Sequence, residues 1–126
     1  LMYTDLHGHS RKFNIFIYGC NNKLSSGRRL LERVFPRMLW DNDRNLFSYS
    51  DCNFHVSKSK ESTARVVCWR ELGLLNSFTM EASFAGCQMG PLKGCHFRSQ
   101  DLEHMGVVWC KTILRYCKPD YHGSIH

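Results

Sequence analysis

At 126 residues, 43% of them hydrophobic, the chain is long enough for one domain with a core. Its 17 Lys and Arg outnumber its 11 Asp and Glu, so the formal net charge of +6 favours an acidic partner, but the basic residues form no tail that indicates nucleic-acid binding. The seven cysteines lack a Cys-x-x-Cys pair, which is typical of reduced cytosolic thiols, and the apolar stretches are too short to span a membrane.

The chain begins with two predicted strands. Residues 1–6 have the composition of a short strand that ends at His7, and Gly8 would then allow a turn. Residues 13–19 alternate apolar with other side chains and predict a second strand. A loop composition follows and leads to the first predicted helix.

Residues 28–40 have the spacing of a helix, with Pro36 inside it. Either the helix kinks at this proline or a new helix starts near Phe35. The apolar residues that share a face by this spacing are Leu30, Leu31, Val34, Phe35 and Met38. Residues 46–56 have weak signals and are predicted to be extended or irregular.

A short helix is predicted over residues 63–72 and would be closed by Gly73. Residues 76–84 predict a strand, and a loop rich in glycine follows. Strands and helices therefore alternate along the chain. This order predicts an α/β fold in which a partial mixed sheet is flanked by helices.

The last helix has the clearest pattern in the chain. Ser99 is the predicted N-cap, Asp101 complements the positive end of the helix dipole, and Pro119 follows the end of the helix. Its apolar stripe comprises Leu102, Met105, Trp109, Ile113 and Tyr116.

Glu81 is the first candidate for chemistry, because it is the only charged residue between Leu72 and Leu92. Burying a lone carboxylate in a strand is costly unless a cation or a metal compensates it, and such costs are concentrated at functional sites. The alternative is that Glu81 lies at the exposed end or on the solvent face of its strand.

His7 and His9 are candidates for a metal site, because residues two apart on a strand share a face and imidazole is a common zinc ligand. Two histidines do not complete a zinc site, so a polar turn with surface histidines is the alternative. Neither His-Glu-x-x-His nor His-x-x-Glu occurs in the chain.

Lys58, Lys60 and Arg65 lie in and just after a polar loop before the second predicted helix. Such a group would suit an acidic ligand, since arginine binds carboxylates through two donors. A solvated basic loop without a specific role is the alternative.

The motifs in this order resemble the second half of the catalytic domain of the cytosolic carboxypeptidases, the tubulin-deglutamylating branch of the zinc carboxypeptidases. The segments that carry the resemblance are "DLHGHSRKFNIFIYGC", "LLERVFPRML", "ARVVCWRELGLLNSFTMEASFAG" and "DLEHMGVVWCKTIL". They cover nearly the whole chain, and the pairing of "DLHGHSRK" with "FTMEASF" is the most specific feature.

The resemblance implies roles for individual residues. His7 matches the family's third zinc ligand, whereas His9 looks like a neighbour that lines the cleft. Glu81 matches the catalytic glutamate, which takes a proton from water and passes it to the leaving amine. Arg65, with Lys60 behind it, is expected to meet the acidic side chain of the substrate.

The resemblance also implies a cofactor, binding partners and a cellular location. The cofactor would be zinc, and the partner would be glutamylated tubulin or another acidic protein tail, with no nucleic acid and no membrane. The protein would be cytoplasmic, with association to microtubules, centrioles or the base of cilia. A nucleic-acid module is disfavoured, since the aromatic residues lie on core-like stripes rather than among Lys and Arg.

Residues 1–126 would be the C-terminal part of such a domain, because the chain departs from the family pattern. The first two zinc ligands of the family form a His-x-x-Glu motif that is not found here, and the arginines that clamp the terminal carboxylate of the substrate are also not found. We expect a longer parent protein to be an active carboxypeptidase and this segment alone to be inactive. A truncated relative that binds acidic tails without cutting them is the alternative.

Overall fold

The computed structural model describes residues 1–23 and 26–118. Its strands are β1 (Met2–His9), β2 (Ile15–Tyr18) and β3 (Asn76–Ser83), and they form a mixed sheet in the order β1-β3-β2. β3 lies in the middle, parallel to β1 and antiparallel to β2. The connection from β1 to β2 therefore crosses the C-terminal end of β3.

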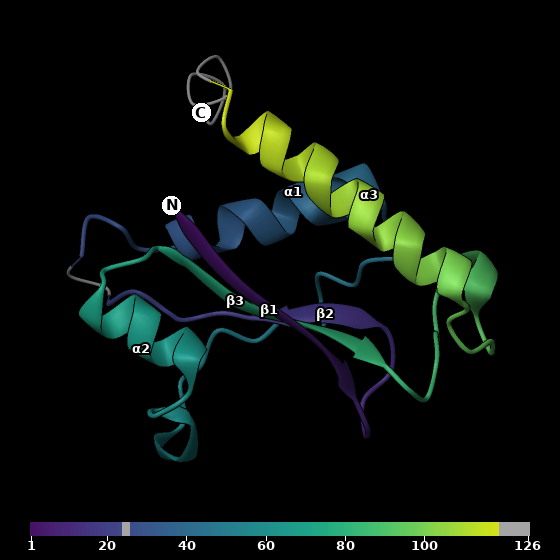
Figure 1. Cartoon of the computed structure of the whole chain (residues 1–126), viewed down its shortest axis with the longest axis horizontal. Helices are drawn as coiled ribbons and strands as arrows, with labels where there is room; N and C mark the ends of the chain where they lie inside the picture. The colour runs from purple at the N-terminus through teal and green to yellow at the C-terminus, as the bar shows by residue number, and fades with distance from the viewer. Residues whose placement is uncertain (24–25, 119–126) are drawn as a thin grey trace.

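Helices cover both faces of the sheet, which confirms the predicted α/β fold. In Figure 1, α1 and α3 lie above the sheet and α2 lies below it. The helices are α1 (Val34–Asn42), α2 (Ala64–Glu71) and α3 (Ser99–Tyr116), with 3₁₀ turns η1 (Leu31–Arg33), η2 (Lys58–Lys60) and η3 (Gly90–Leu92). No helix in the described part of the chain is long and apolar enough to cross a membrane.

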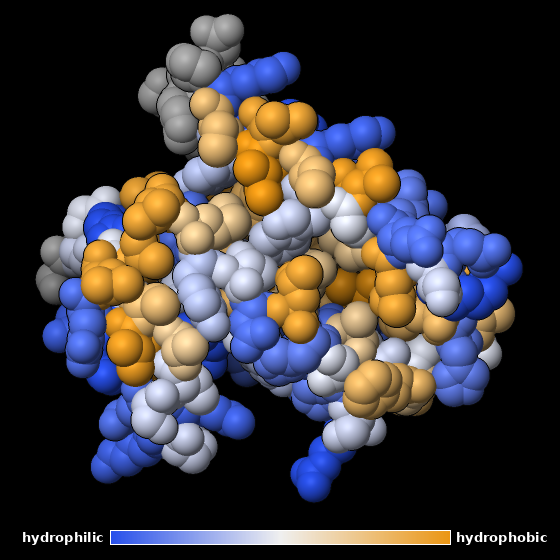
Figure 2. All heavy atoms as spheres, viewed as in Figure 1, coloured by the Kyte–Doolittle hydropathy of each residue, from blue (hydrophilic) through white to orange (hydrophobic). Residues whose placement is uncertain are grey.

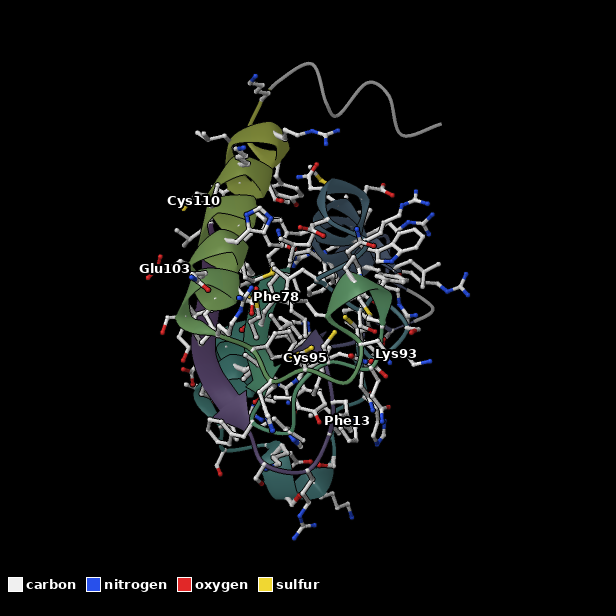
Figure 3. The ribbon with its side chains drawn as sticks, turned by 90° about the vertical axis from the view of Figure 1, so that its right-hand side faces the viewer. Phe13, Phe78, Lys93, Cys95, Glu103 and Cys110 are labelled. Carbon is white, nitrogen blue, oxygen red and sulfur yellow. The ribbon has the colours of Figure 1, made fainter. Side chains whose placement is uncertain are left out.

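The main core lies between the sheet and the pair α1 and α3. The ring of Phe35 on α1 stacks on Phe78 of β3 at 5.9 Å and meets Trp109 of α3 edge-on at 4.9 Å. Figure 3 shows Phe78 in the interior, whereas Glu103 and Cys110 project outward from α3. Because side chains alternate along a strand, the residues of β3 that follow and precede Phe78 face α2 instead.

β1 is longer than predicted and includes Gly8 and His9, so the predicted turn at Gly8 is wrong. Gly8 pairs with Ala82 of β3, because β3 offers hydrogen-bond partners along the whole of β1. The ring of Phe84 covers Gly8 so closely that a Cβ atom there would collide with it. The glycine therefore permits close packing and does not make a turn.

The first helix begins at Val34 rather than at residue 28, which confirms a start near Phe35 and not a kink. Pro36 lies in the first turn, where a helix needs no backbone N–H. Leu30 adopts a positive φ of 66° and is 47% exposed, so it does not belong to the buried face. Leu31 is likewise 42% exposed.

The remaining elements follow the predictions with small differences. α2 and β3 form as expected, and Gly73 has the positive φ of 65° that closes a helix. Residues 46–56 are irregular and contact the sheet through isolated bridges at Phe47 and Asn53.

α3 differs from its prediction at two positions. The predicted N-cap at Ser99 is wrong, because Arg98 holds that place and its backbone N–H donates to Asp101 at 2.8 Å. Leu102 is 47% exposed, so the predicted apolar stripe packs on the core only from Met105 onward. Pro119 lies outside the described residues.

Candidate active site

His7 and Glu81 lie side by side at the carboxyl ends of two parallel strands. The β1–β3 register places His7 opposite Glu81, and Nδ1 of the imidazole is 3.1 Å from Oε2 of the carboxylate. In open α/β sheets this end of the strands is where ligands bind. The structure therefore brings two of the three predicted site residues into direct contact.

Glu81 is 4% exposed, so the alternative of a solvent-facing glutamate is wrong. β1 flanks it on one side, and the fully buried Phe16 of β2 lies opposite it on the other. Among the described residues its only ion-pair partner is His7, whose side chain is 49% exposed. A buried carboxylate with a single, half-exposed imidazole beside it is suited to accept protons from the cleft.

Asp5 is a site residue that the sequence analysis did not identify. Its Oδ2 lies 3.6 Å from Nε2 of His7, on the other side of the imidazole from Glu81. At this distance the contact is electrostatic rather than a hydrogen bond. A carboxylate near the second nitrogen is typical of metal-binding histidines, and the i, i+2 spacing on a strand was the available signal.

His9 has a different environment, although it lies on the same face of β1. Its Nδ1 accepts hydrogen bonds from the backbone N–H groups of Arg11 at 3.1 Å and Lys12 at 3.0 Å. The ring centroid lies 5.6 Å from that of Phe16 and 6.4 Å from that of Tyr18. His9 thus stabilises the connection after β1, and one of its nitrogens is already engaged.

A cleft of about 590 Å³ opens between the ends of the strands and the segment before α2. Its lining includes His7, His9, Tyr18, Lys60, Arg65 and Glu81. The cleft therefore joins residues from both halves of the chain, and all three predicted site residues line it.

Arg65 is buried at 7% exposure in the wall of this cleft, so the solvated-loop alternative is wrong for this residue. Its Nη1 donates to the carbonyl of Gly19 and lies 3.6 Å from Sγ of Cys20. Burial raises the pKa of the Cys20 thiol, and the neighbouring guanidinium opposes this effect. In the described part of the chain no carboxylate lies within ion-pair distance of Arg65, which leaves a buried positive charge beside the cleft.

Lys58 and Lys60 are exposed, in contrast to Arg65. Lys60 lines the cleft, whereas Lys58 does not, and both lie in η2. The structure therefore separates the basic group of the sequence into one buried arginine, one lysine at the cleft and one surface lysine.

The donor set fits zinc in kind, but it supplies a single ligand. His7 is an imidazole with one carboxylate near each nitrogen, and a metal ion would take the place of one of these contacts while the other orients the ring. Across residues 1–23 and 26–118 no three His, Cys, Asp or Glu side chains gather to hold a metal ion. Further ligands would have to come from outside these residues.

Comparison with known proteins identifies relatives over nearly the whole chain. It is 52% identical over 123 residues to cytosolic carboxypeptidase 3 of Mus musculus, 49% over 120 residues to cytosolic carboxypeptidase 2 of Danio rerio, and 52% over 122 residues to cytosolic carboxypeptidase 2 of Homo sapiens. Each alignment covers 95% of this chain but only 12%, 16% and 13% of the respective relative. No family model matches the chain.

Proposed function

Because this chain belongs to the family of cytosolic carboxypeptidases, we propose that it is the part of a zinc carboxypeptidase that carries the catalytic glutamate and one metal ligand. The observation that supports this most strongly is the contact of 3.1 Å between the buried Glu81 and His7. In this proposal His7 is the ligand, and His9 is not, because its Nδ1 accepts two backbone N–H groups and the proton of the neutral ring is therefore on Nε2.

Glu81 is the general base of the proposed reaction. When bound, zinc would polarise the scissile carbonyl and make water a nucleophile near neutral pH. Glu81 takes the proton of this water and delivers it to the amine that leaves. Since β1 and β2 enclose the carboxylate from both sides, only the cleft is open to water and substrate.

Arg65 supports an acidic substrate. A buried guanidinium without a carboxylate partner among the described residues has donors that a glutamate side chain of the substrate can occupy. Lys60 adds an exposed positive charge to the same cleft. We therefore propose that the substrates are glutamylated protein tails, tubulin first.

The proposed location follows from the family and not from the fold. The relatives are named cytosolic carboxypeptidases, so we propose a cytoplasmic protein. An enzyme that acts on tubulin tails would associate with microtubules, centrioles or the base of cilia. The formal net charge of +6 suits such acidic partners.

The isolated chain is proposed to be inactive. The chain contains no His-x-x-Glu motif, and a single imidazole does not hold zinc tightly. A non-catalytic relative that binds acidic tails is the second candidate, since the free donors of Arg65 need no metal to bind a carboxylate.

Glutamate release separates the two candidates. The full-length polypeptide that carries this chain is incubated with a peptide that ends in glutamates, with zinc or with a chelator. The proposal expects release with zinc, loss of release with chelator, and no release by residues 1–126 alone. Binding of the peptide that is unchanged by chelator, without any release, would support the non-catalytic relative instead.

A further inference from the structure

His9 offers the cleft a hydrogen-bond donor with a defined position. A ring nitrogen that accepts two backbone N–H groups carries no proton, so the proton of the neutral ring is on Nε2. The hydroxyl of Ser83 donates to the carbonyl of Lys12, which fixes the same connection from the other side. No acceptor among the described residues bonds to Nε2 of His9, and this N–H is therefore available to a ligand.

The ammonium group of Lys12 adds a positive charge near the ring of His9. Its ammonium lies 5.2 Å from the ring centroids of both Phe16 and Tyr18, the two rings against which His9 also packs. Cation–π contacts position an ammonium without neutralising its charge. In the described residues no carboxylate is within ion-pair distance of Lys12.

The two donors, Nε2 of His9 and the ammonium of Lys12, lie near the carboxylate of Glu81 and come from a different segment of the chain than Arg65. Phe16, the ring near both donors, is opposite Glu81 in the sheet, and His9 and Glu81 line the same cleft. Tyr18 contacts both Lys12 and Arg65, the latter at 6.0 Å from the guanidinium carbon. The ammonium of Lys12 and the guanidinium of Arg65 thus lie near the same ring, that of Tyr18, which lines the cleft.

We propose that His9 and Lys12 form a second carboxylate subsite, which binds an acidic side chain next to the residue whose side chain meets Arg65. Nε2–H and the ammonium donate to the two oxygens of that carboxylate in charge-assisted hydrogen bonds. The inference rests on the proposed function, since it assigns the subsite to the same peptide substrate.

The chain allows matched variants for each donor. His9→Asn keeps an acceptor oxygen near the position of Nδ1 and removes the outer donor, whereas His9→Gln keeps an outer amide donor and removes the inner acceptor. Lys12→Gln removes the charge and keeps a polar side chain. Lys93→Gln is the control, because Lys93, labelled in Figure 3, is an exposed lysine that does not line the cleft.

The test measures peptide binding to the full-length zinc-loaded polypeptide with Glu81→Gln, so that the peptide is cleaved too slowly to disturb the binding measurement. Two peptides are compared that end in Glu-Glu or in Gln-Glu and are otherwise identical. We expect the unmodified subsite to favour Glu-Glu, and both Lys12→Gln and His9→Asn to lower this preference about threefold. Lys93→Gln should keep the preference, and His9→Gln should keep more of it than His9→Asn.

The outcomes distinguish the subsite from the proposed function. If both peptides bind but the preference is the same with and without Lys12→Gln and His9→Asn, the subsite is wrong and the proposed function stands. If neither peptide binds the parent polypeptide, the proposed function is wrong and the subsite falls with it.

Discussion

Oε2 of Glu81 and Nδ1 of His7 are 3.1 Å apart, although 74 residues separate them in the chain. The parallel pairing of β1 with β3 creates this contact, because it places the two residues in register. Glu81 lies in the middle strand, so β1 and β2 shield its carboxylate on both sides. The carboxylate therefore faces the cleft.

Glu81→Gln should reduce turnover of the full-length polypeptide by about 10²- to 10⁴-fold, because it removes the proton acceptor and keeps the volume of the side chain. The measurement is the kcat for release of glutamate from a glutamate-ended peptide. Glu103→Gln, on the outward side of α3 in Figure 3, should have no effect. Equal rates for Glu81→Gln and Glu103→Gln would exclude Glu81 as the base.

Arg65→Gln should lower the preference for a terminal glutamate over a terminal glutamine by about tenfold or more, because the guanidinium pairs with the acidic side chain. The measurement is the ratio of kcat/KM for two peptides that differ only in the last residue. Arg70→Gln is the control, since Arg70 lies exposed on the same helix. An unchanged ratio in Arg65→Gln would show that Arg65 only supports the carbonyl of Gly19.

Phe35→Ala should lower the free energy of unfolding by about 3–5 kcal/mol, because the ring is fully buried between Phe78 and Trp109. Chemical denaturation measures the difference. Phe13→Ala should cost clearly less, since Phe13 is 38% exposed. A similar loss in both variants would contradict the core described here.

Stability should fall at alkaline pH because of Cys52. Burial raises the pKa of its thiol from 9.0 to about 12, so between these values the unfolded chain releases a proton that the folded chain retains. This group therefore stabilises the fold fully below about pH 9 and loses its contribution as the pH rises toward 12. The unfolding free energy of Cys52→Ala should decline less steeply over this range.

Cys110→Ala is the matched control for the alkaline prediction, because Cys110 is exposed. Its unfolding free energy should fall with pH as steeply as that of the unmodified protein. The same slope in Cys52→Ala as in Cys110→Ala would show that Cys52 does not contribute to the pH dependence.

Local pattern predicted the elements, but it did not predict how they meet. The isolated charge of Glu81 in an apolar strand marked it as a candidate, because burial of a lone carboxylate is costly, but the pattern alone left its burial open and the family resemblance supplied its expected role. The contact with His7 depends on a register between strands that are far apart in the chain, and no local spacing specifies such a register.

The errors have the same physical origin. Gly8 was predicted to turn because glycine permits a turn, but pairing with β3, distant in sequence, keeps it in the strand, where the ring of Phe84 packs over it. Leu30 has helical spacing, yet the chain places it in a turn with positive φ. The burial of Arg65 could not be predicted from the sequence either, since it depends on how α2 packs on the sheet.

The surface of the described chain carries exposed apolar side chains. Figure 2 shows apolar side chains in several patches over the visible face, and the large exposed residues of the described chain include Leu6 at 61% and Phe84 at 70%. Both also line a second hollow of about 400 Å³ between the sheet and the start of α3.

The role of His7 is tested most directly by the zinc content of the full-length polypeptide in three forms: unmodified, His7→Gln and His9→Asn. We expect one zinc ion per molecule in the unmodified protein and in His9→Asn, and a large loss of zinc affinity in His7→Gln. Full retention of zinc by His7→Gln, or loss of zinc only in His9→Asn, would contradict the assignment of His7 as the metal ligand beside Glu81.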